Sequence, residues 1–317
     1  MKEYKEAMIK ELNKIKKLLK EKNNTISSKD LILDKEILLY QIYGKQFSEE
    51  YESINDNLKE NDIKKTILTN KIKKIPIKPI YGINKKNNSF QIVDKFLEED
   101  TFDLKEFYKI IKNENTLFYT KDIPKLSGCT IYLNSIKKNY VLINKNNTNY
   151  DGAILIHELG HVKQNLLSRK FVNKKLTSNF DETYSYFLTL VYFNYLKKIG
   201  FDKDSFNYKY NFLDKLLLEI DGLSEMVICE EINSKRFKYE YKLIISELLA
   251  IYFYNLYLFD DKKCIQLINE FNKNYENVSD YDLLKSINLD FSIFENKNIL
   301  NTFINLLKEE KSKIKKI

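Results

Sequence analysis

The stretch Ile154–His161, with the sequence ILIHELGH, most constrains what this chain can fold into. His157 and His161 are the only two histidines among 317 residues, and both belong to one H-E-x-x-H pattern, in which Glu158 follows the first. Four residues are just over one helical turn, so a helix presents both imidazoles on one face. The apolar residues 153–156 are typical of a buried helix start. We therefore predict a helix whose paired imidazoles hold Zn²⁺.

The predicted zinc site needs a third protein ligand and one open position. Because the chain has no third histidine, that ligand must be a carboxylate or a thiolate. Glu182 is the preferred candidate, since it begins the next strongly helical stretch 21 positions after His161. The alternative for Glu182 is a carboxylate that only stabilises a helix N-terminus. The stretch Cys229–Glu231 offers fallback ligands, and Asp181 is predicted to orient an imidazole N–H.

The chemistry expected of such a site is peptide-bond hydrolysis. Zinc lowers the pKa of a bound water to about 7 and polarises the carbonyl, and Glu158 takes the proton of that water and passes it to the leaving amine. A tyrosine hydroxyl is expected to stabilise the oxyanion. The candidates in a later helical stretch are Tyr239 and Tyr241, followed by Tyr252 and Tyr254, although in a chain with 23 tyrosines each one is more often a core or surface residue.

Composition narrows the class of protein. The net charge of +8 comes almost wholly from lysines that are interspersed with acids, which favours solvated helix faces over a nucleic-acid partner. No apolar run reaches the ~18–20 residues of a membrane span, and the charged N-terminus is unlike a secretory signal. The three cysteines are odd in number and widely spaced, which indicates a reducing compartment. We expect a cytoplasmic protein with no membrane partner; the oligomeric state stays open.

Hydrophobic periodicity predicts a mainly α fold. Two β-prone segments, 128–133 and 139–144, predict a small sheet beside the active-site helix, with no other sizeable strand. Prolines and polar residues near position 82 mark a linker between an N-terminal helical segment, 1–82, and a catalytic domain, 83–317. Helices are expected over residues 1–22, 31–47, 51–72, 90–99 (after a Ser89 cap), 104–111 (after an Asp103 cap), 182–198, 212–220, 239–259 and, as short pieces, 261–316.

Three blocks of sequence resemble the oligoendopeptidase F branch of the thimet oligopeptidase family of zinc peptidases. The first, KLSG at 125–128 and NYVLIN at 139–144 followed by the His157 pattern, is similar to that family's K-x-S-G-A, N-P-Y-V-L-L-N and H-E-x-G-H segments. The second, DETYS at 181–185, resembles a helix whose glutamate is the third zinc ligand. The third, FKYEY at 237–241, is similar to a segment whose tyrosines stabilise the oxyanion. The resemblance covers about residues 89–260.

The resemblance implies a helical zincin-type metallopeptidase, with one Zn²⁺ per chain and a deep cleft between two helical lobes that admits oligopeptides. It also implies that an edge strand pairs with the substrate backbone, which makes Thr130, Ile131 and Tyr132 predicted substrate contacts together with Tyr252. Two departures stand out. Members of that family are roughly twice as long, and two of their histidines are absent here, one of them replaced by Gln164.

Two other functions fit the same motif. A regulatory protease of narrow specificity, of the ImmA/IrrE type, also places H-E-L-G-H after a strand. A peptide-binding relative that has lost catalytic efficiency would explain the missing histidines and the short N-terminal part. The intact His157, Glu158 and His161 favour the zinc metalloendopeptidase over both.

Overall fold

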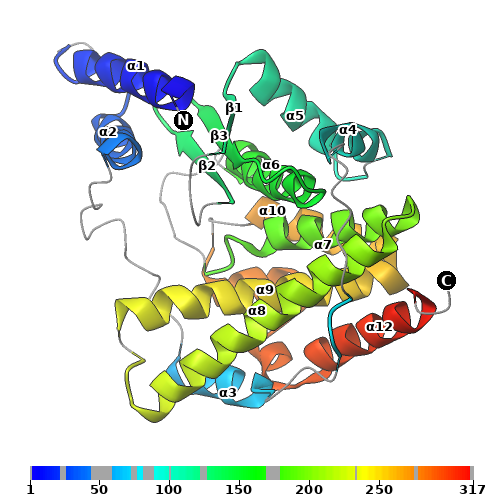
Figure 1. The fold of residues 1–317 in the computed structure, drawn as a ribbon. Coiled ribbons are helices and arrows are strands. Elements are labelled where there is room, and N and C mark those ends of the chain that lie inside the picture. The colour runs from blue at the N-terminus through cyan, green and yellow to red at the C-terminus, as the bar shows by residue number, and fades with distance from the viewer. Residues whose placement is uncertain are drawn as a thin grey trace.

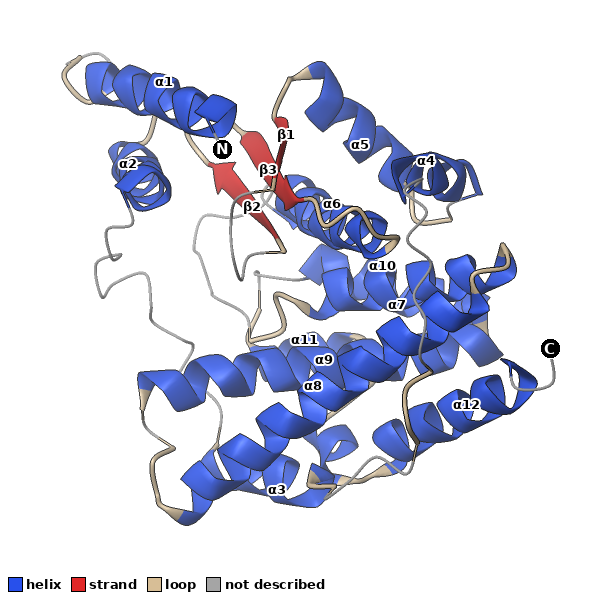
Figure 2. Cartoon of the chain, in the orientation of Figure 1, coloured by secondary structure: helices blue, strands red, loops and turns tan. Residues whose placement is uncertain are grey.

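The computed structural model describes residues 2–21, 26–43, 59–72, 77–80, 89–99, 101–121, 127–168, 179–232, 234–274 and 278–314. Helices dominate these residues, and three short strands form one small sheet (Figures 1 and 2). The elements are α1 (Lys2–Leu18), α2 (Ser28–Tyr43), α3 (Glu60–Asn70), α4 (Ser89–Glu99), α5 (Leu104–Asn113), β1 (Leu117–Thr120), β2 (Gly128–Leu133), β3 (Lys138–Asn144), α6 (Tyr150–Ser168), α7 (Thr183–Lys198), α8 (Asp202–Ile228), α9 (Lys235–Phe259), α10 (Asp261–Asn274), α11 (Asp280–Ser286), a 3₁₀ turn η2 (Phe291–Glu295) and α12 (Asn298–Ile314).

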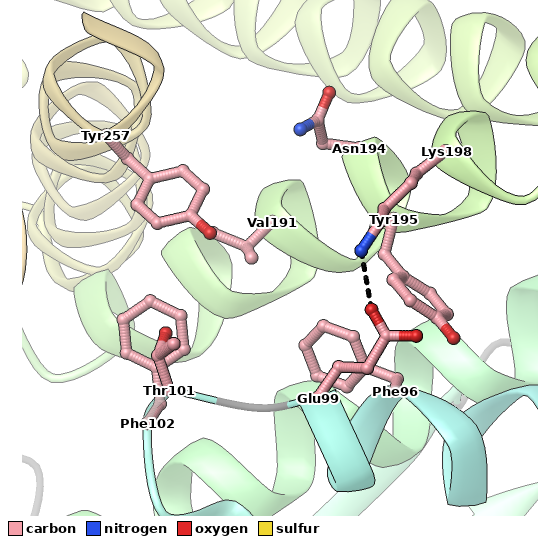
Figure 3. A pocket seen from close by; sticks show the side chains of 9 residues that line it. All are labelled: Phe96, Glu99, Thr101, Phe102, Val191, Asn194, Tyr195, Lys198 and Tyr257. Carbon is pink, nitrogen blue, oxygen red and sulfur yellow. Dashed lines mark hydrogen bonds and ion pairs between the residues drawn. The ribbon is translucent and has the colours of Figure 1, made fainter. Parts of the chain in front are cut away.

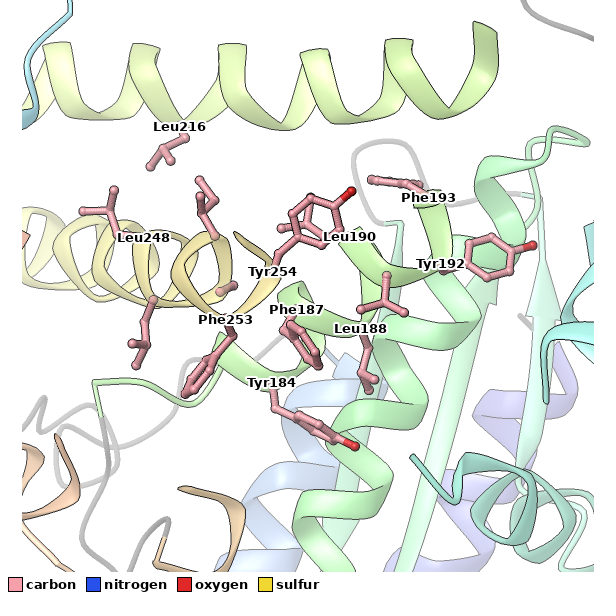
Figure 4. Close-up of a cluster of buried hydrophobic side chains, with 14 of the residues drawn as sticks. Tyr184, Phe187, Leu188, Leu190, Tyr192, Phe193, Leu216, Leu248, Phe253 and Tyr254 are labelled. Atoms are coloured by element: carbon pink, nitrogen blue, oxygen red, sulfur yellow. The ribbon is translucent and has the colours of Figure 1, made fainter. Parts of the chain in front are cut away.

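The core lies around α7, which packs against α6, α8 and α9. Helix α7 is apolar on nearly all sides, as expected of a helix surrounded by others. Its aromatic and leucine side chains interdigitate with those of α8 and α9, including Leu216 and Phe253 (Figure 4). Helix α9 is long and apolar enough over Arg236–Phe259 to cross a membrane. However, 61% of an apolar 18-residue stretch within it is buried inside the protein, which is typical of a core helix.

The sheet has the strand order β1-β3-β2, with β1 parallel and β2 antiparallel to the central β3. Both predicted strands are therefore present, together with the short strand β1, which the sequence analysis did not identify. Strand β1 is only four residues long and directly follows α5, so it has too few alternating positions to show a period of two. Strand β3 delivers the chain into α6 through the turn at 145–149, which places the sheet beside that helix.

Helices α1 and α2 form a second apolar cluster on the sheet. Met8, Leu12 and Leu38 pack there with Leu133, Tyr140 and Leu142 of the strands. Both carboxylate oxygens of the buried Asp34 accept backbone N–H groups in the β2–β3 turn, from Asn134 at 2.9 Å and Ser135 at 2.7 Å. This hairpin of helices therefore fixes the end of β2.

The predicted helices are present where the structure describes them, with different limits. Helix 212–220 is part of the much longer α8, and the last helix, α12, spans 17 residues. Asp103 holds the N-cap position of α5 in a left-handed conformation (φ 57°), but its side chain makes no capping bond. Residues 44–47 and 51–58 of two predicted helices lie outside the described residues, as does the predicted domain boundary after residue 82.

Candidate metal centre

A close contact between α6 and α7 brings the predicted ligands together. His157 and His161 project from α6, and Glu182 occupies the N-cap position of α7. The helices touch at Gly160, where a Cβ would lie 2.6 Å from Ser185 Oγ and 3.0 Å from Ser185 Cα. Any larger residue at position 160 would separate the two helices, so this glycine sets how near Glu182 comes to the histidines.

The three side chains form a triad of mutually close donor atoms. His157 Nε2 and His161 Nε2 are 3.3 Å apart, and each lies 3.2 Å from Glu182 Oε2. Ligands about 2.0–2.1 Å from a tetrahedral zinc ion are roughly 3.4 Å from one another, so the triad has the spacing of three zinc ligands. Glu182 makes no capping bond with its side chain, which favours the ligand interpretation over the helix-terminus alternative.

Hydrogen bonds and charges within the triad set its protonation. Thr189 Oγ1 donates to the Ser185 carbonyl at 2.8 Å, so in its 3.4 Å contact with His157 Nδ1 the imidazole is the donor. With Nδ1 directed at Thr189, the Nε2 atom of His157 faces Glu182. Burial lowers the pKa of His161, but the Glu182 carboxylate outweighs burial and raises that pKa to about 9. Burial raises the pKa of Glu182, yet the two imidazoles hold it well below its ordinary value.

Glu158 lies on the strand side of the triad and is almost fully buried. Its Oε2 accepts a hydrogen bond from Thr130 Oγ1 of β2 at 2.7 Å. A Cβ at Gly128 would stand 2.6 Å from Glu158 Oε1, so glycine is required for β2 to come this close. Burial raises the pKa of Glu158, while the imidazoles and the Thr130 hydrogen bond oppose that rise. The structure thus holds the Glu158 carboxylate against strand β2, while the Glu182 carboxylate belongs to the triad.

The predicted tyrosines separate in space. Tyr239 is 59% exposed, and the charges that act on its pKa, after burial, are those of Glu182, Lys242, Asp181 and Lys215. Tyr241 instead is 2% exposed, stacks on Phe237 and lies beside Thr66 of α3. Tyr252 packs against Phe253, beside Cys264 of α10. Of the three, the structure brings only Tyr239 near the triad, because successive helical residues point in different directions.

The side chains of the other predicted residues have partners within the described structure. Asp181 forms an ion pair of 2.6 Å with Lys242 of α9. The contact with an imidazole N–H that was predicted for Asp181 is made by Thr189, beside His157. Ile131 packs against the α1–α2 cluster on the opposite face of β2 from Thr130, and Tyr132 is largely buried. The fallback stretch Cys229–Glu231 lies at the C-terminal end of α8, outside the triad.

Thr189 and Tyr186 were missed by the sequence reasoning. Tyr186 lies one helical turn after Glu182 and Thr189 lies two, a spacing that could have suggested them. The Tyr186 ring contacts the His157 ring at 5.1 Å between centroids. Behind it, Lys215 Nζ of α8 bridges Glu247 at 3.0 Å and Glu219 at 3.4 Å. Burial raises the pKa of the fully buried Glu247 to about 7; Lys215 opposes that rise and Glu219 adds to it.

A separate small cavity of about 120 Å³ lies at the other end of α7, between α4 and α9. Its lining includes Phe96, Asn194 and Tyr257, and the ion pair between Lys198 Nζ and Glu99 Oε2, at 2.5 Å, stands beside it (Figure 3). None of the triad residues lines this cavity.

No family model and no curated protein matches the sequence. Solved structures do match the fold. A Bacillus anthracis strain Ames protein assigned as oligoendopeptidase F has a TM-score of 0.57 at 14% identity, over 90% of this chain. PZ peptidase A with an inhibitor has a TM-score of 0.60 at 15% identity over 87%, and another protein assigned as oligoendopeptidase F has 0.59 at 14% over 90%.

This chain spans 62%, 61% and 65% of those three chains, in the same order. At such low identity the likeness shows a shared fold. It confirms the mainly α fold with a small sheet beside the motif helix that the sequence predicts.

Proposed function

We propose that this chain is a zinc-dependent peptide hydrolase. The observation that carries the proposal is the triad of His157 Nε2, His161 Nε2 and Glu182 Oε2, all within 3.3 Å of one another and next to the buried carboxylate of Glu158. The triad side chains remain 19%, 20% and 26% exposed, so a substrate can reach them. The proteins that share the fold are named as peptidases, which supports the same class of reaction here.

Each residue has a distinct role in this proposal. The triad would hold a zinc ion, which supplies a Lewis acid and lowers the pKa of a water. Glu158 takes a proton from the attacking water at its carboxylate and returns it to the leaving amine. Burial raises the pKa of Glu158, which makes its carboxylate a stronger base. The exposed Tyr239 hydroxyl donates a hydrogen bond to the oxygen that becomes negative in the transition state.

We further propose that the substrates are oligopeptides cut at internal bonds, in a reducing compartment. The substrate backbone would pair with β2, which is an edge strand of the described sheet. The free thiols among the described residues suit such a compartment.

The test compares zinc-loaded wild type with Glu158→Gln on a mixed peptide library, with metal content measured on the same samples. We expect equal zinc content and a loss of cleavage of roughly 100-fold or more in Glu158→Gln. Glu225→Gln, the same change at an exposed position of α8, should cleave at the wild-type rate. Cleavage by Glu158→Gln at the wild-type rate would refute the proposed role of Glu158. Peptide binding without turnover in wild type would refute the proposal that the chain is an enzyme.

A further inference from the structure

The hydrogen-bond pattern of the sheet shows which backbone groups of β2 face outward. Asn144 N donates to Ser127 O at 2.8 Å, and the antiparallel register pairs Gly128 with Ile143 and Thr130 with Val141. Hydrogen-bonded and non-hydrogen-bonded pairs alternate along an antiparallel ladder. Cys129 and Ile131 therefore direct their backbone groups at β3. The N–H and C=O of Gly128, Thr130 and Tyr132 point to the outer edge, with which no described strand pairs.

The same stretch of β2 also holds Glu158 by its side chains. The Thr130 hydroxyl donates to Glu158 Oε2 at 2.7 Å, and Glu158 Oε1 lies against the α-carbon side of Gly128. Both carboxylate oxygens thus rest on two residues whose backbone groups face the outer edge. Threonine is β-branched and stiff about χ1, so the direction of its hydroxyl follows the strand backbone.

From this juxtaposition we infer that Thr130 is a positioning residue, which couples the pairing of a peptide backbone with β2 to the orientation of Glu158. An extended peptide that adds to the outer edge fixes the Thr130 backbone through main-chain hydrogen bonds. The stiff side chain then holds Glu158 Oε2, so that the other oxygen is free to take a proton. The inference rests on the proposed function and adds to it a link between substrate binding and the base.

The first test uses Thr130→Val and Thr130→Ser in the zinc-loaded full chain with one cleaved peptide. Valine keeps the β-branched shape and the backbone groups but removes the hydroxyl; serine keeps the hydroxyl. We expect kcat of Thr130→Val to fall roughly 10- to 100-fold with little change in KM, because a hydrogen bond to a charged group is lost and the base loses its orientation. Thr130→Ser should recover most of kcat.

Thr116→Val is the matched control. It removes a buried threonine hydroxyl that donates to the Ile111 carbonyl next to β1, away from the triad. It should leave kcat unchanged. Wild-type kcat in Thr130→Val, or a Thr130→Ser variant as slow as Thr130→Val, would overturn the inference.

The coupling itself is tested with a series of substrates that are N-methylated at one backbone amide each. Methylation at the amide that bonds to β2 should lower kcat in wild type. It should lower kcat much less in Thr130→Val, because Glu158 is no longer held by Thr130 in that variant. Equal losses in both proteins would show that strand pairing and base orientation are independent, and the inference would fall.

A measurement without catalysis separates failure of this inference from failure of the proposed function. In metal-free protein, Thr130→Val, Glu158→Ala and the double variant form a thermodynamic cycle, read as shifts in the midpoint of thermal unfolding. We expect a non-additive shift, and additivity would refute the Thr130–Glu158 contact. A non-additive cycle in a protein that cleaves nothing would instead refute the proposed function, and with it the positioning role.

Discussion

At the scale of single residues, the triad is a set of lone pairs that face one another. The His157 tautomer set by Thr189 turns one lone pair toward Glu182 Oε2, and His161 Nε2 meets the same oxygen. Without a positive charge between them, these atoms repel each other. Despite burial, the Glu182 carboxylate raises the pKa of His161 to about 9, so a proton on His161 can supply this charge in metal-free protein. A metal ion and the His161 proton therefore compete for the same position between the three triad atoms.

Tyr239 and Tyr241 differ in exposure, and this gives a matched pair of variants. Tyr239→Phe should lower kcat roughly 100-fold through loss of an oxyanion donor, with a free energy of unfolding within about 0.5 kcal/mol of wild type. Tyr241→Phe should keep kcat but change the free energy of unfolding by about 1 kcal/mol, because its hydroxyl is buried. Peptide assays measure kcat and urea titrations measure the free energy of unfolding. The reverse pattern would make Tyr241 the oxyanion donor and Tyr239 the structural residue.

The sequence was sufficient to predict that His157, His161 and Glu182 lie together, because a metal site needs three ligands and histidines are so scarce that few choices remain. It did not predict the contacts of Lys242 or Lys215. These side chains reach the site from α9 and α8, and nothing in local periodicity tells which face of one core helix meets which neighbour. The same gap explains why Tyr241 and Tyr252 were chosen along with Tyr239.

At the scale of elements, the distance between α6 and α7 controls the site, and Gly160 controls that distance. Gly160→Ala places a methyl group 3.0 Å from the Ser185 backbone, so the helices must separate. We expect weaker zinc binding, measured by chelator competition, and a loss of about 1–3 kcal/mol in the free energy of unfolding.

Gly222→Ala in α8 is the control for Gly160→Ala, because its added methyl meets nothing within 4 Å. It should leave zinc binding unchanged and stabilise the protein by about 0.5–1 kcal/mol, the gain of alanine over glycine inside a helix. Equal zinc affinities in wild type and Gly160→Ala would contradict this account of the helix contact.

Helices and strands with a long, regular hydrophobic pattern were predicted well, whereas short elements and polar helix turns were not. Strands β2 and β3 carry β-prone runs of six and seven residues and were found, whereas the four residues of β1 were missed. Only the middle of α8 was predicted. Its first turns are mostly polar in sequence, yet residues such as Asn207 and Lys209 are buried there by partners distant in the chain, including Ile80 and Glu310.

At the scale of the whole molecule, Glu247 makes stability depend on pH. It is buried where α7, α8 and α9 meet, and burial raises its pKa to about 7. In the unfolded chain a glutamate titrates near 4.3. Between these pH values the folded protein keeps a proton that the unfolded chain releases, so the free energy of unfolding should fall as pH rises from about 4.5 to 7.

Glu247→Gln stays neutral throughout and should show a flatter dependence, measured by urea unfolding at several pH values between 5 and 8. Its advantage over wild type should grow as pH rises from 5 toward 7 and level off above 7, where Glu247 is ionised in both the folded and the unfolded wild type. Glu225→Gln, at an exposed site, should follow the wild-type curve. Parallel curves for wild type and Glu247→Gln would show that Glu247 is ionised in the folded protein across this range.

Both imidazoles of the chain belong to the triad, and this has a spectroscopic consequence. A nitrogen-detected magnetic resonance spectrum of the imidazole region contains signals from two residues only, so each line comes from the site. The tautomer of His157, the charge on His161 and the arrival of a metal can then be followed in the intact protein without labelling individual positions. The scarcity of histidine makes the site its own reporter.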